Sequence, residues 1–405
     1  MQSSSLSTRP LWLVLLCAGI IVGAAMGLRQ VMGLYLRPMS MDLGLGREPF
    51  SNAMALSNLI NGAGAILAGA IADKYGAGRV LVAGTVFTIL GLLTFTIAQT
   101  PFDLLMGGLL LGIGITGTGI NSLVGTVGRI APADRRTAAI ASLGMSSGIG
   151  GFLAFPYAHT LMQLYGWQSS LVALAVTATI MIPLAAALRG KPQPAPGIVR
   201  KQTLREAFAE AFTHPSFWLL TAGFFVCGFH VSFYSVHLPA FVQDQGLDPW
   251  VGVWALMAVG IANIIGTWLA GQSARIMQKR MSLTIIYLAR TALFLAILYL
   301  PTTPVTVIVI SALLGLFWLS TIPLTSSMVA TFFGTTWMSM LFGFVFFSHQ
   351  LGSFLGLWTA GRLFDMTRSY DLMWWISAGL GLFAALMHWP IRERPVPRVL
   401  AEQAA

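Results

Sequence analysis

Long apolar stretches follow one another along the chain, and short polar segments separate them. Each stretch comes close to the roughly 20 residues that a helix needs to cross a bilayer. The stretches lie at residues 11–36, 50–72, 80–98, 102–126, 137–162, 169–188, 215–242, 250–272, 281–300, 304–330, 338–361 and 371–391. This pattern predicts an all-α membrane protein with twelve transmembrane helices. The first apolar run is too long for a signal peptide and further spans follow it, so we treat it as a helix.

Composition agrees with a membrane protein. The 405 residues are 56% hydrophobic and 9% charged, whereas a soluble domain carries about 25% charged residues. Cys17 and Cys227 both fall within predicted spans, so we expect two packing residues and no structural disulfide.

The net charge of +10 is unevenly distributed between the two sides of the membrane. If the N-terminus is inside, 17 of the 23 Lys and Arg residues flank the cytoplasmic ends of the spans, four lie outside and two are within spans. This is the positive-inside bias that sets the orientation of membrane proteins. We therefore expect both termini in the cytoplasm, and the basic charge does not indicate a nucleic-acid partner.

The second half of the chain repeats the first in register. Identical residues recur at an offset of 201 or 202 positions: Gly27 and Gly228, Pro38 and Pro239, Asn61 and Asn263, Gly64 and Gly266, Ser146 and Ser348, and Gly150 and Gly352. Two similarly oriented six-helix halves are the parallel-repeat plan of secondary transporters, which hold substrate between the halves. The pattern predicts an N-terminal bundle over residues 1–188, a cytoplasmic linker over 189–214 and a C-terminal bundle over 215–405.

The predicted linker is basic and rich in proline at residues 189–196, which favours an extended chain. It continues into Thr203-Leu-Arg-Glu206, a capping-box pattern followed by apolar residues at helical spacing. We expect a short amphipathic helix on the cytoplasmic surface that tethers the two bundles.

Three pairs of glycines have the spacing of helix-packing motifs. They are Gly108 and Gly112, Gly144 and Gly148, and Gly352 and Gly356. Drug/proton antiporters usually place a proline after the second glycine of the fifth helix, but Ile149 follows Gly148 here. This difference argues against multidrug efflux.

Two arginines, Arg29 and Arg290, lie deep within apolar stretches, and no Asp or Glu occupies the middle of such a stretch. An arginine near the bilayer centre costs about 2.5–3.5 kcal/mol on insertion scales, and it usually faces a cavity or a partner. Two cations without a carboxylate partner suggest an anionic substrate. Each also has a structural alternative, because Arg29 can reach outward to the interface and Arg290 can bond to helix carbonyls.

Three polar residues of the seventh span share one helix face. His230, Tyr234 and His237 are spaced by four and three residues, and repeat symmetry places His230 opposite Arg29. Histidine changes charge near neutral pH, which makes His230 and His237 the proton-coupling candidates. Each histidine is alternatively a satisfied polar packing residue. The substrate-binding candidates are Arg29, Asn61, Asn121, His230, Tyr234, Asn263, Arg290 and His349.

The loop between the second and third spans reads Gly69-Ala-Ile-Ala-Asp73-Lys-Tyr-Gly76-Ala-Gly-Arg79. It resembles the loop signature of the major facilitator superfamily, and the resemblance to this superfamily covers nearly the full chain. The resemblance implies two pseudo-symmetric six-helix bundles, and it makes Asp73 and Arg79 gating residues that close the cytoplasmic side. In the second half, Arg275 stands where the acidic residue is expected.

Within the superfamily, the chain resembles bacterial transporters of the monocarboxylate and oxalate/formate group. The stretches that carry this resemblance are residues 27–44 with Phe50-Ser51, and residues 228–239. The resemblance implies a carrier of small organic anions in the bacterial inner membrane. Animal monocarboxylate carriers keep an Asp and an Arg in the eighth helix, but residues 263–271 contain neither, so their proton-coupling pair has no counterpart here.

Together these features predict a secondary active transporter that moves a small organic anion by alternating access, with a monocarboxylate as the first candidate. Coupling would use protons or the exchange of one anion for another, and we expect a monomer in contact with membrane lipid. Multidrug efflux and a transporter-like ligand sensor are the alternatives. The sequence contains no nucleotide loop, metal-ligand spacing or nucleophile constellation, so we expect neither an enzyme nor a cofactor.

Overall fold

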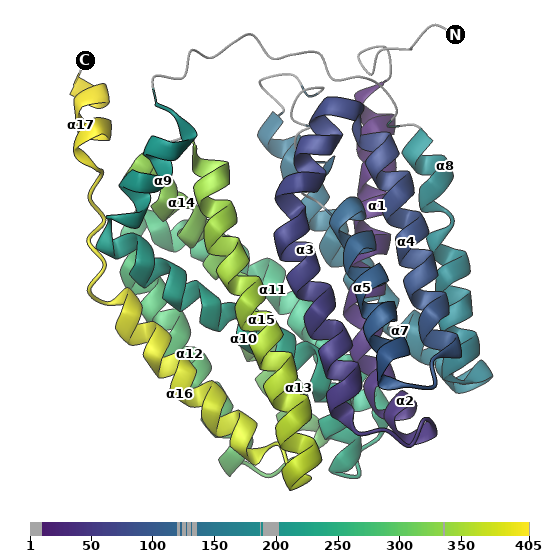
Figure 1. Ribbon diagram of the computed structural model, residues 1–405. Helices are drawn as coiled ribbons and strands as arrows, with labels where there is room; N and C mark the ends of the chain where they lie inside the picture. The colour runs from purple at the N-terminus through teal and green to yellow at the C-terminus, as the bar shows by residue number, and fades with distance from the viewer. Residues whose placement is uncertain are drawn as a thin grey trace, which may run out of the picture.

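The computed structural model describes residues 10–119, 122–123, 127, 131, 136–186, 188, 202–334 and 337–404. This part of the chain consists of helices and short connections, without strands. The helices form two bundles that stand side by side, one from each half of the chain (Figure 1).

The N-terminal bundle begins with a span in three pieces, α1 (Leu11–Gln30), the short 3-10 segment η2 (Val31–Tyr35) and α2 (Leu36–Asp42). It continues through α3 (Arg47–Tyr75), α4 (Ala77–Ile97), α5 (Pro101–Thr118), α7 (Arg136–Ala178) and α8 (Met181–Ala186). Gly166 interrupts α7 with φ 77° and ψ 169°, so the chain turns there between two antiparallel pieces.

The C-terminal half begins with the short helix α9 (Leu204–Phe212) and the long helix α10 (Pro215–Asp244). It continues through α11 (Pro249–Ile276), α12 (Lys279–Tyr299), α13 (Pro304–Leu316), α14 (Thr321–Phe333), α15 (Met338–Thr367), α16 (Asp371–His388) and α17 (Pro397–Ala404). The tenth predicted span, residues 304–330, is therefore broken between α13 and α14 instead of continuous.

The predicted twelve-span topology is confirmed. In the described part, ten helical segments are long and apolar enough to cross a membrane. One of them, Ser142–Ala186, contains the fifth and sixth predicted spans on either side of Gly166. The second predicted span corresponds to α3, whose 29 residues exceed the roughly 20 that a bilayer requires.

Glycines hold neighbouring helices close together at equivalent places in the two bundles. On α7, Gly150 faces α1 so closely that an added Cβ would overlap the carbonyl oxygen of Gly23. On α15, Gly352 faces α10 in the same way, against the carbonyl oxygen of Phe225. Gly150 and Gly352 are repeat-related positions, so the sequence repeat marks the same helix contact in both bundles.

The predicted packing pair of Gly144 and Gly148 on α7 is not in close contact in this structure. A Cβ added to Gly144 would meet no described atom within 4 Å. One added to Gly148 would approach only the side chain of Ile264, at 3.9 Å. The reason is the position of these glycines, which lie toward the end of α7 where the bundles diverge.

The predicted linker helix is present as α9. Thr203 Oγ1 accepts a hydrogen bond from the Glu206 backbone N–H at 3.3 Å, and Glu206 Oε2 accepts one from the Thr203 N–H at 2.8 Å. These bonds favour the ionised carboxylate, so they lower the pKa of Glu206. Residues 189–201 of the predicted linker lie outside the described part.

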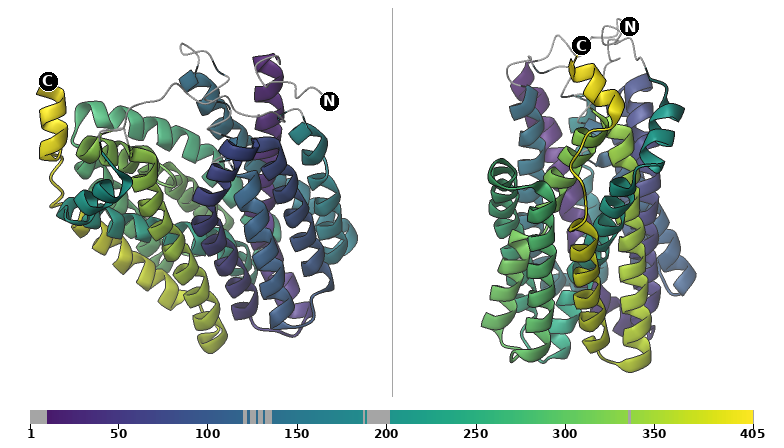
Figure 2. Two further views of the ribbon diagram at one scale, coloured as in Figure 1. Left: turned by 45° about the horizontal axis from the view of Figure 1, so that its top comes forward. Right: turned by 90° about the vertical axis from the view of Figure 1, so that its left-hand side faces the viewer.

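The two bundles are inclined to each other. They are close together at one end and diverge toward the end at which α1 begins and α17 ends (Figures 1 and 2). Helices α3 and α15 pack along the boundary between the bundles, as do α7 and α11. The end opposite the termini is therefore where the two bundles meet most closely.

Gly150→Leu is expected to destabilise the protein, because a side chain there has no room against α1. Overpacking a core typically costs about 1–3 kcal/mol, so the melting temperature of the purified protein should fall by several degrees. Gly144→Leu is the matched control on the same helix, and it should leave the melting temperature unchanged. Equal losses for the two variants would contradict this assignment of the packing contact.

Candidate functional site

Arg29 lies deep in the first span, about 27 Å along the helix from Leu11. Its Nη2 donates a hydrogen bond to Asn58 Oδ1 on α3 at 2.8 Å. Asn58 Nδ2 in turn donates to Ser232 Oγ on α10 at 3.3 Å. This chain of three side chains links the N-terminal bundle to the C-terminal bundle.

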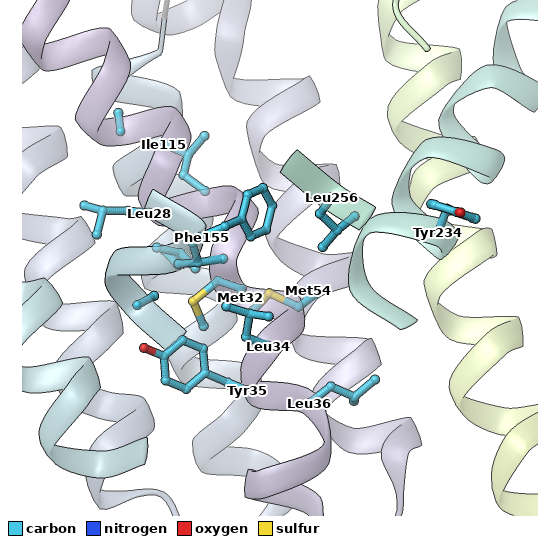
Figure 3. Packing of buried hydrophobic residues seen from close by; sticks show 14 of the residues in the cluster. Leu28, Met32, Leu34, Tyr35, Leu36, Met54, Ile115, Phe155, Tyr234 and Leu256 are labelled. Carbon is cyan, nitrogen blue, oxygen red and sulfur yellow. The ribbon is translucent and has the colours of Figure 1, made fainter. Parts of the chain in front are cut away.

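Arg29 has no carboxylate partner among the described residues. Its side chain is half-buried, and a guanidinium carries five N–H donors, so most of them are available after the bond to Asn58. The neighbouring residues Leu28 and Met32 pack among apolar side chains (Figure 3). A charge beside such apolar surroundings is weakly screened, which strengthens its attraction for an anion.

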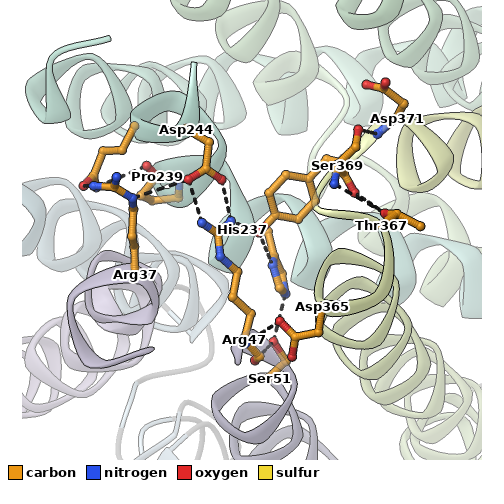
Figure 4. Close-up of polar contacts among 12 residues, drawn as sticks. Arg37, Arg47, Ser51, His237, Pro239, Asp244, Asp365, Thr367, Ser369 and Asp371 are labelled. Carbon is orange, nitrogen blue, oxygen red and sulfur yellow. Dashed lines mark hydrogen bonds and ion pairs between the residues drawn. The ribbon is translucent and has the colours of Figure 1, made fainter. Parts of the chain in front are cut away.

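At the closed end of the molecule, a polar cluster joins the two bundles (Figure 4). We call this cluster the latch, and its members are Arg47 and Ser51 of α3, His237 and Asp244 of α10, Asp365 of α15, and Tyr370, which directly precedes α16. Arg47 is central and only 6% exposed. Its guanidinium pairs with the Asp244 carboxylate at 2.6 and 2.7 Å and donates to the Tyr370 hydroxyl at 2.7 Å. The latch is thus built around one buried cation that reaches from one bundle into the other.

Asp365 completes the first turn of α3 from the opposite bundle. Its two carboxylate oxygens accept hydrogen bonds from the backbone N–H groups of Arg47 and Glu48, each at 2.8 Å. The residue at the usual capping position is Gly46, where an added Cβ would overlap the Asp365 carboxylate. A carboxylate at a helix N-terminus satisfies free N–H groups and interacts favourably with the helix dipole. The cap of α3 therefore depends on closure of the two bundles.

His237 is fully buried within the latch. Its Nδ1 lies 2.9 Å from the Tyr370 hydroxyl and its Nε2 lies 3.2 Å from Ser51 Oγ. This predicted proton-coupling candidate therefore contacts both bundles. Two further ion pairs flank the latch: Arg37 with Asp244 at 3.4 Å, and Arg362 with Glu48 at 3.2 Å.

His230 and Tyr234 lie in the interior of the C-terminal bundle. His230 Nε2 is 2.9 Å from the Ser377 carbonyl oxygen on α16, and the Tyr234 hydroxyl is 2.7 Å from Ser311 Oγ on α13. Both side chains are only 1% exposed. In this arrangement, repeat symmetry does not bring the side chains of Arg29 and His230 together.

Arg290 supports the break in the tenth span. Its guanidinium donates to the carbonyl oxygens of Phe317 and Trp318, which become free where α13 ends. From α11, Asn263 Oδ1 accepts a hydrogen bond from the Leu319 N–H at 2.9 Å. These bonds satisfy backbone groups that a continuous helix would have paired itself. Both predicted substrate residues therefore have structural partners inside the C-terminal bundle.

The remaining predicted residues are spread over the molecule. Asn61 and His349 are buried on α3 and α15, the helices that follow the boundary between the bundles. Asn121 and the side chain of Asp73 lie outside the described residues. Arg79 is exposed and lines an apolar groove of about 510 Å³ between α3, α4 and α5.

Sequence reasoning did not identify the latch, nor Asn58 and Ser232 beside Arg29. Arg47, Asp244 and Asp365 each flank an apolar stretch, where charged residues are ordinary. The partners of Arg47 are also distant in sequence, at separations of 197 and 318 residues. One usable signal was present, because the twelve-span topology puts these opposite charges at the same end of their helices.

Asp365→Ala is expected to favour opening at the latch end, because it removes the carboxylate that caps α3. Loss of a helix cap costs about 0.5–2 kcal/mol, so the ratio of closed to open molecules should fall about 2- to 30-fold. Nitroxide labels at the exposed positions Met41 and Gln245, one on each bundle at this end, would measure opening by pulsed EPR. Asp371→Ala is the control, since it removes the same charge from the start of α16, and an equal shift for both variants would contradict the capping role.

Comparison with known proteins identifies the family. Residues 11–357 match the sequence model of the Major Facilitator Superfamily. Monocarboxylate transporter 11 of Mus musculus is 27% identical over 271 residues, which cover 64% of this chain and 59% of the relative. The gallate transporter of Pseudomonas putida is 30% identical over 179 residues, which cover 43% and 38% of the two chains. The fujikurins efflux protein of Gibberella fujikuroi is 26% identical over 250 residues, which cover 58% and 50%.

The matched stretches thus span about two fifths to three fifths of the length of these relatives.

Solved structures share the fold at low sequence identity. A mutant of the nucleoside transporter NupG has a TM-score of 0.78 at 15% identity, covering 93% of this chain and 99% of that one. The inward-open xylose transporter of E. coli has a TM-score of 0.73 at 13% identity, covering 94% and 96%. Because the family model matches most of the length of this chain, the chain belongs to the Major Facilitator Superfamily.

Proposed function

We propose that this protein is a secondary active transporter for a small organic anion, with a monocarboxylate as the first candidate substrate. The environment of Arg29 is the observation that supports this function. Arg29 is half-buried between the bundles, bonds to a neutral amide and has no carboxylate partner among the described residues. Such a cation is suited to receive an anion that enters between the bundles.

A carboxylate suits Arg29 better than the Asn58 amide does. Guanidinium and carboxylate form two parallel charge-assisted hydrogen bonds, which are roughly twice as strong as bonds between neutral groups. An empty site carries a positive charge that is costly within the membrane, and one bound carboxylate neutralises it. Arg290 is already engaged by helix carbonyls, so only Arg29 of the two arginines is available to bind an anion. One available arginine favours a substrate with one carboxylate.

Two of the relatives support this substrate class. They are named as a monocarboxylate transporter and a gallate transporter, and both names denote acids with one carboxylate. A site built around one arginine agrees with such acids. The matched segments cover only part of each relative, so the transport of an organic acid by this chain is proposed on the surroundings of Arg29 together with these names.

Transport would proceed by alternating access between the bundles. In the structure, the bundles meet through the latch and diverge toward the termini (Figure 1). The positive-inside bias favours cytoplasmic termini, so a solute from the cytoplasm would reach Arg29 and be stopped by the latch. Release on the other side requires Arg47 to separate from Asp244. On the cytoplasmic side, Asp73 and Arg79 are the gate that the family resemblance suggests.

Coupling would use either protons or anion exchange. An empty, positively charged site resists reorientation across the membrane, whereas a site with a bound anion does not, and this difference supports exchange. Proton symport would instead use a histidine or the carboxylate of the substrate itself. His237, which contacts both bundles, is better placed for this role than His230, which is enclosed in one bundle.

Export of a larger solute is a second candidate function. One relative is named as an efflux protein for fujikurins, and it matches more than half of this chain. In that case Arg29 would still bind an anionic group, but transport would run from the cytoplasm outward. Inside-out and right-side-out vesicles distinguish import from export in the same assay.

Uptake of radiolabelled lactate, pyruvate, oxalate, acetate and gallate into proteoliposomes tests the proposal. Arg29→Gln removes the charge but keeps a polar side chain. Loss of a hydrogen bond to a charged group costs about 1.5–3 kcal/mol, so uptake at low substrate concentration should fall about 10- to 150-fold. Arg29→Lys keeps the charge without the planar fork and should be intermediate.

Arg205→Gln is the matched control, because it removes an exposed arginine from α9 and should transport normally. Accumulation driven by an inward proton gradient would indicate symport, and uptake only against an internal anion would indicate exchange. Normal uptake by folded Arg29→Gln would contradict the role of Arg29. If no acid moves under either condition, the monocarboxylate proposal is overturned.

A further inference from the structure

His237 belongs to a closed ring of hydrogen bonds within the latch. The ring runs from the Arg47 guanidinium to Tyr370, then to His237, then to Ser51, and back to the Arg47 carbonyl oxygen. The four contacts measure 2.7, 2.9, 3.2 and 2.8 Å in that order. Arg47 and Ser51 belong to the N-terminal bundle and the other two residues to the C-terminal half, so the ring closes only when the bundles meet.

The donors of the ring follow from the two groups that have fixed roles. A guanidinium only donates, so the Tyr370 oxygen accepts from Arg47, and His237 Nδ1 is the acceptor within reach of the Tyr370 O–H among the described contacts. A carbonyl only accepts, so the Ser51 hydroxyl donates to Arg47, and Ser51 Oγ accepts from His237 Nε2. The network therefore assigns a single hydrogen to His237, on Nε2, so the imidazole of His237 is neutral.

A second proton on His237 does not fit this ring. It would sit on Nδ1 and face the Tyr370 oxygen, whose own hydrogen would then lose its acceptor. The imidazolium would also be a second cation beside the Arg47 guanidinium, at a position where His237 is fully buried. Protonation therefore opposes closure through both hydrogen bonding and charge.

The neighbouring carboxylates are engaged elsewhere. Asp244 pairs with Arg47 and Arg37, and Asp365 caps α3. The charged and titratable groups around His237 are Arg37 on α2, Arg47 and Glu48 on α3, Asp244 on α10, Arg362 and Asp365 on α15, and Tyr370 before α16. None of the contacts described for these carboxylates goes to His237.

We propose that His237 is a proton-binding site that sets the state of the latch: the latch closes with neutral His237, and binding of a proton opens it. The closed form is then fully populated at high pH and loses population as the pH falls. In the orientation that the positive-inside bias favours, the latch faces the outside, so external acid would hold the protein open on that side. This inference concerns opening and does not depend on which solute is carried.

Pulsed EPR on the protein in lipid nanodiscs tests this proposal directly. The labels at Met41 and Gln245 report opening, and the native residues Cys17 and Cys227 are buried, so only the introduced cysteines should react. Between about pH 8 and about pH 5, which brackets the ordinary titration of histidine, we expect the ratio of open to closed molecules to rise about tenfold.

Matched variants assign the response to a residue. In His237→Gln, an amide accepts and donates as the neutral ring does but binds no proton, so the distance should not change with pH. His388→Gln replaces another fully buried histidine, on α16 and outside the latch, and should keep the response. His230→Gln tests the other predicted proton carrier, and this variant should also keep the pH response.

Tyr370→Phe provides a second arm in case His237→Gln does not fold. It removes the donor to Nδ1 and an acceptor of Arg47, so the open population should be raised already at about pH 8. A response that persists in folded His237→Gln overturns the proposal, as does loss of the response in His230→Gln alone or an unchanged latch in Tyr370→Phe. The labels report distance without any solute, so such a failure leaves the role of Arg29 standing.

Discussion

A guanidinium held away from water must be given hydrogen-bond acceptors, and this requirement organises the protein. Arg47 is paired with a carboxylate, Arg290 with the free carbonyl groups at a helix break, and Arg29 with one amide. Because a buried charge is costly without partners, each solution determines a local structure. Arg47 joins the two bundles, Arg290 stabilises the interruption between α13 and α14, and Arg29 keeps N–H donors for which no acceptor is described.

Close glycine packing occurs within the bundles and also between them, where an added Cβ on Gly33 would overlap the Ser235 carbonyl oxygen, and the latch adds charged contacts between the bundles. Within each bundle, glycines bring helix backbones together, as Gly150 does against α1 and Gly352 against α10. Such close-packed contacts hold each bundle as one body. Between the bundles, the latch consists of ion pairs and hydrogen bonds, which water can replace at a modest net cost. In the proposed alternating access, the two bundles would move as units and the latch would form and break.

Much of the fold was predictable because its signals are local. The lengths of the apolar runs and the capping box at Thr203 each occupy short stretches of sequence, and the repeat of Gly150 in Gly352 follows from one fixed offset along the chain. The latch has no local signal, because Arg47 and Asp365 meet across 318 residues. The break in the tenth span was missed for a similar reason, since Arg290 stabilises it from another helix. Symmetry between the halves relates backbones, and it did not predict that the His230 side chain turns into its own bundle.

The two ends of the boundary between the bundles are chemically different. The latch end closes through charged and titratable groups, which respond to salt and to acid. At the other end, Gly144 leaves one place on α7 uncovered, with no described atom within 4 Å of an added Cβ. A bare helix backbone is a surface on which another helix can settle without any charge. Helix packing at this place would add to the Asp73 and Arg79 gate proposed for the same side, so the two ends of the boundary would close through different combinations of charge and packing.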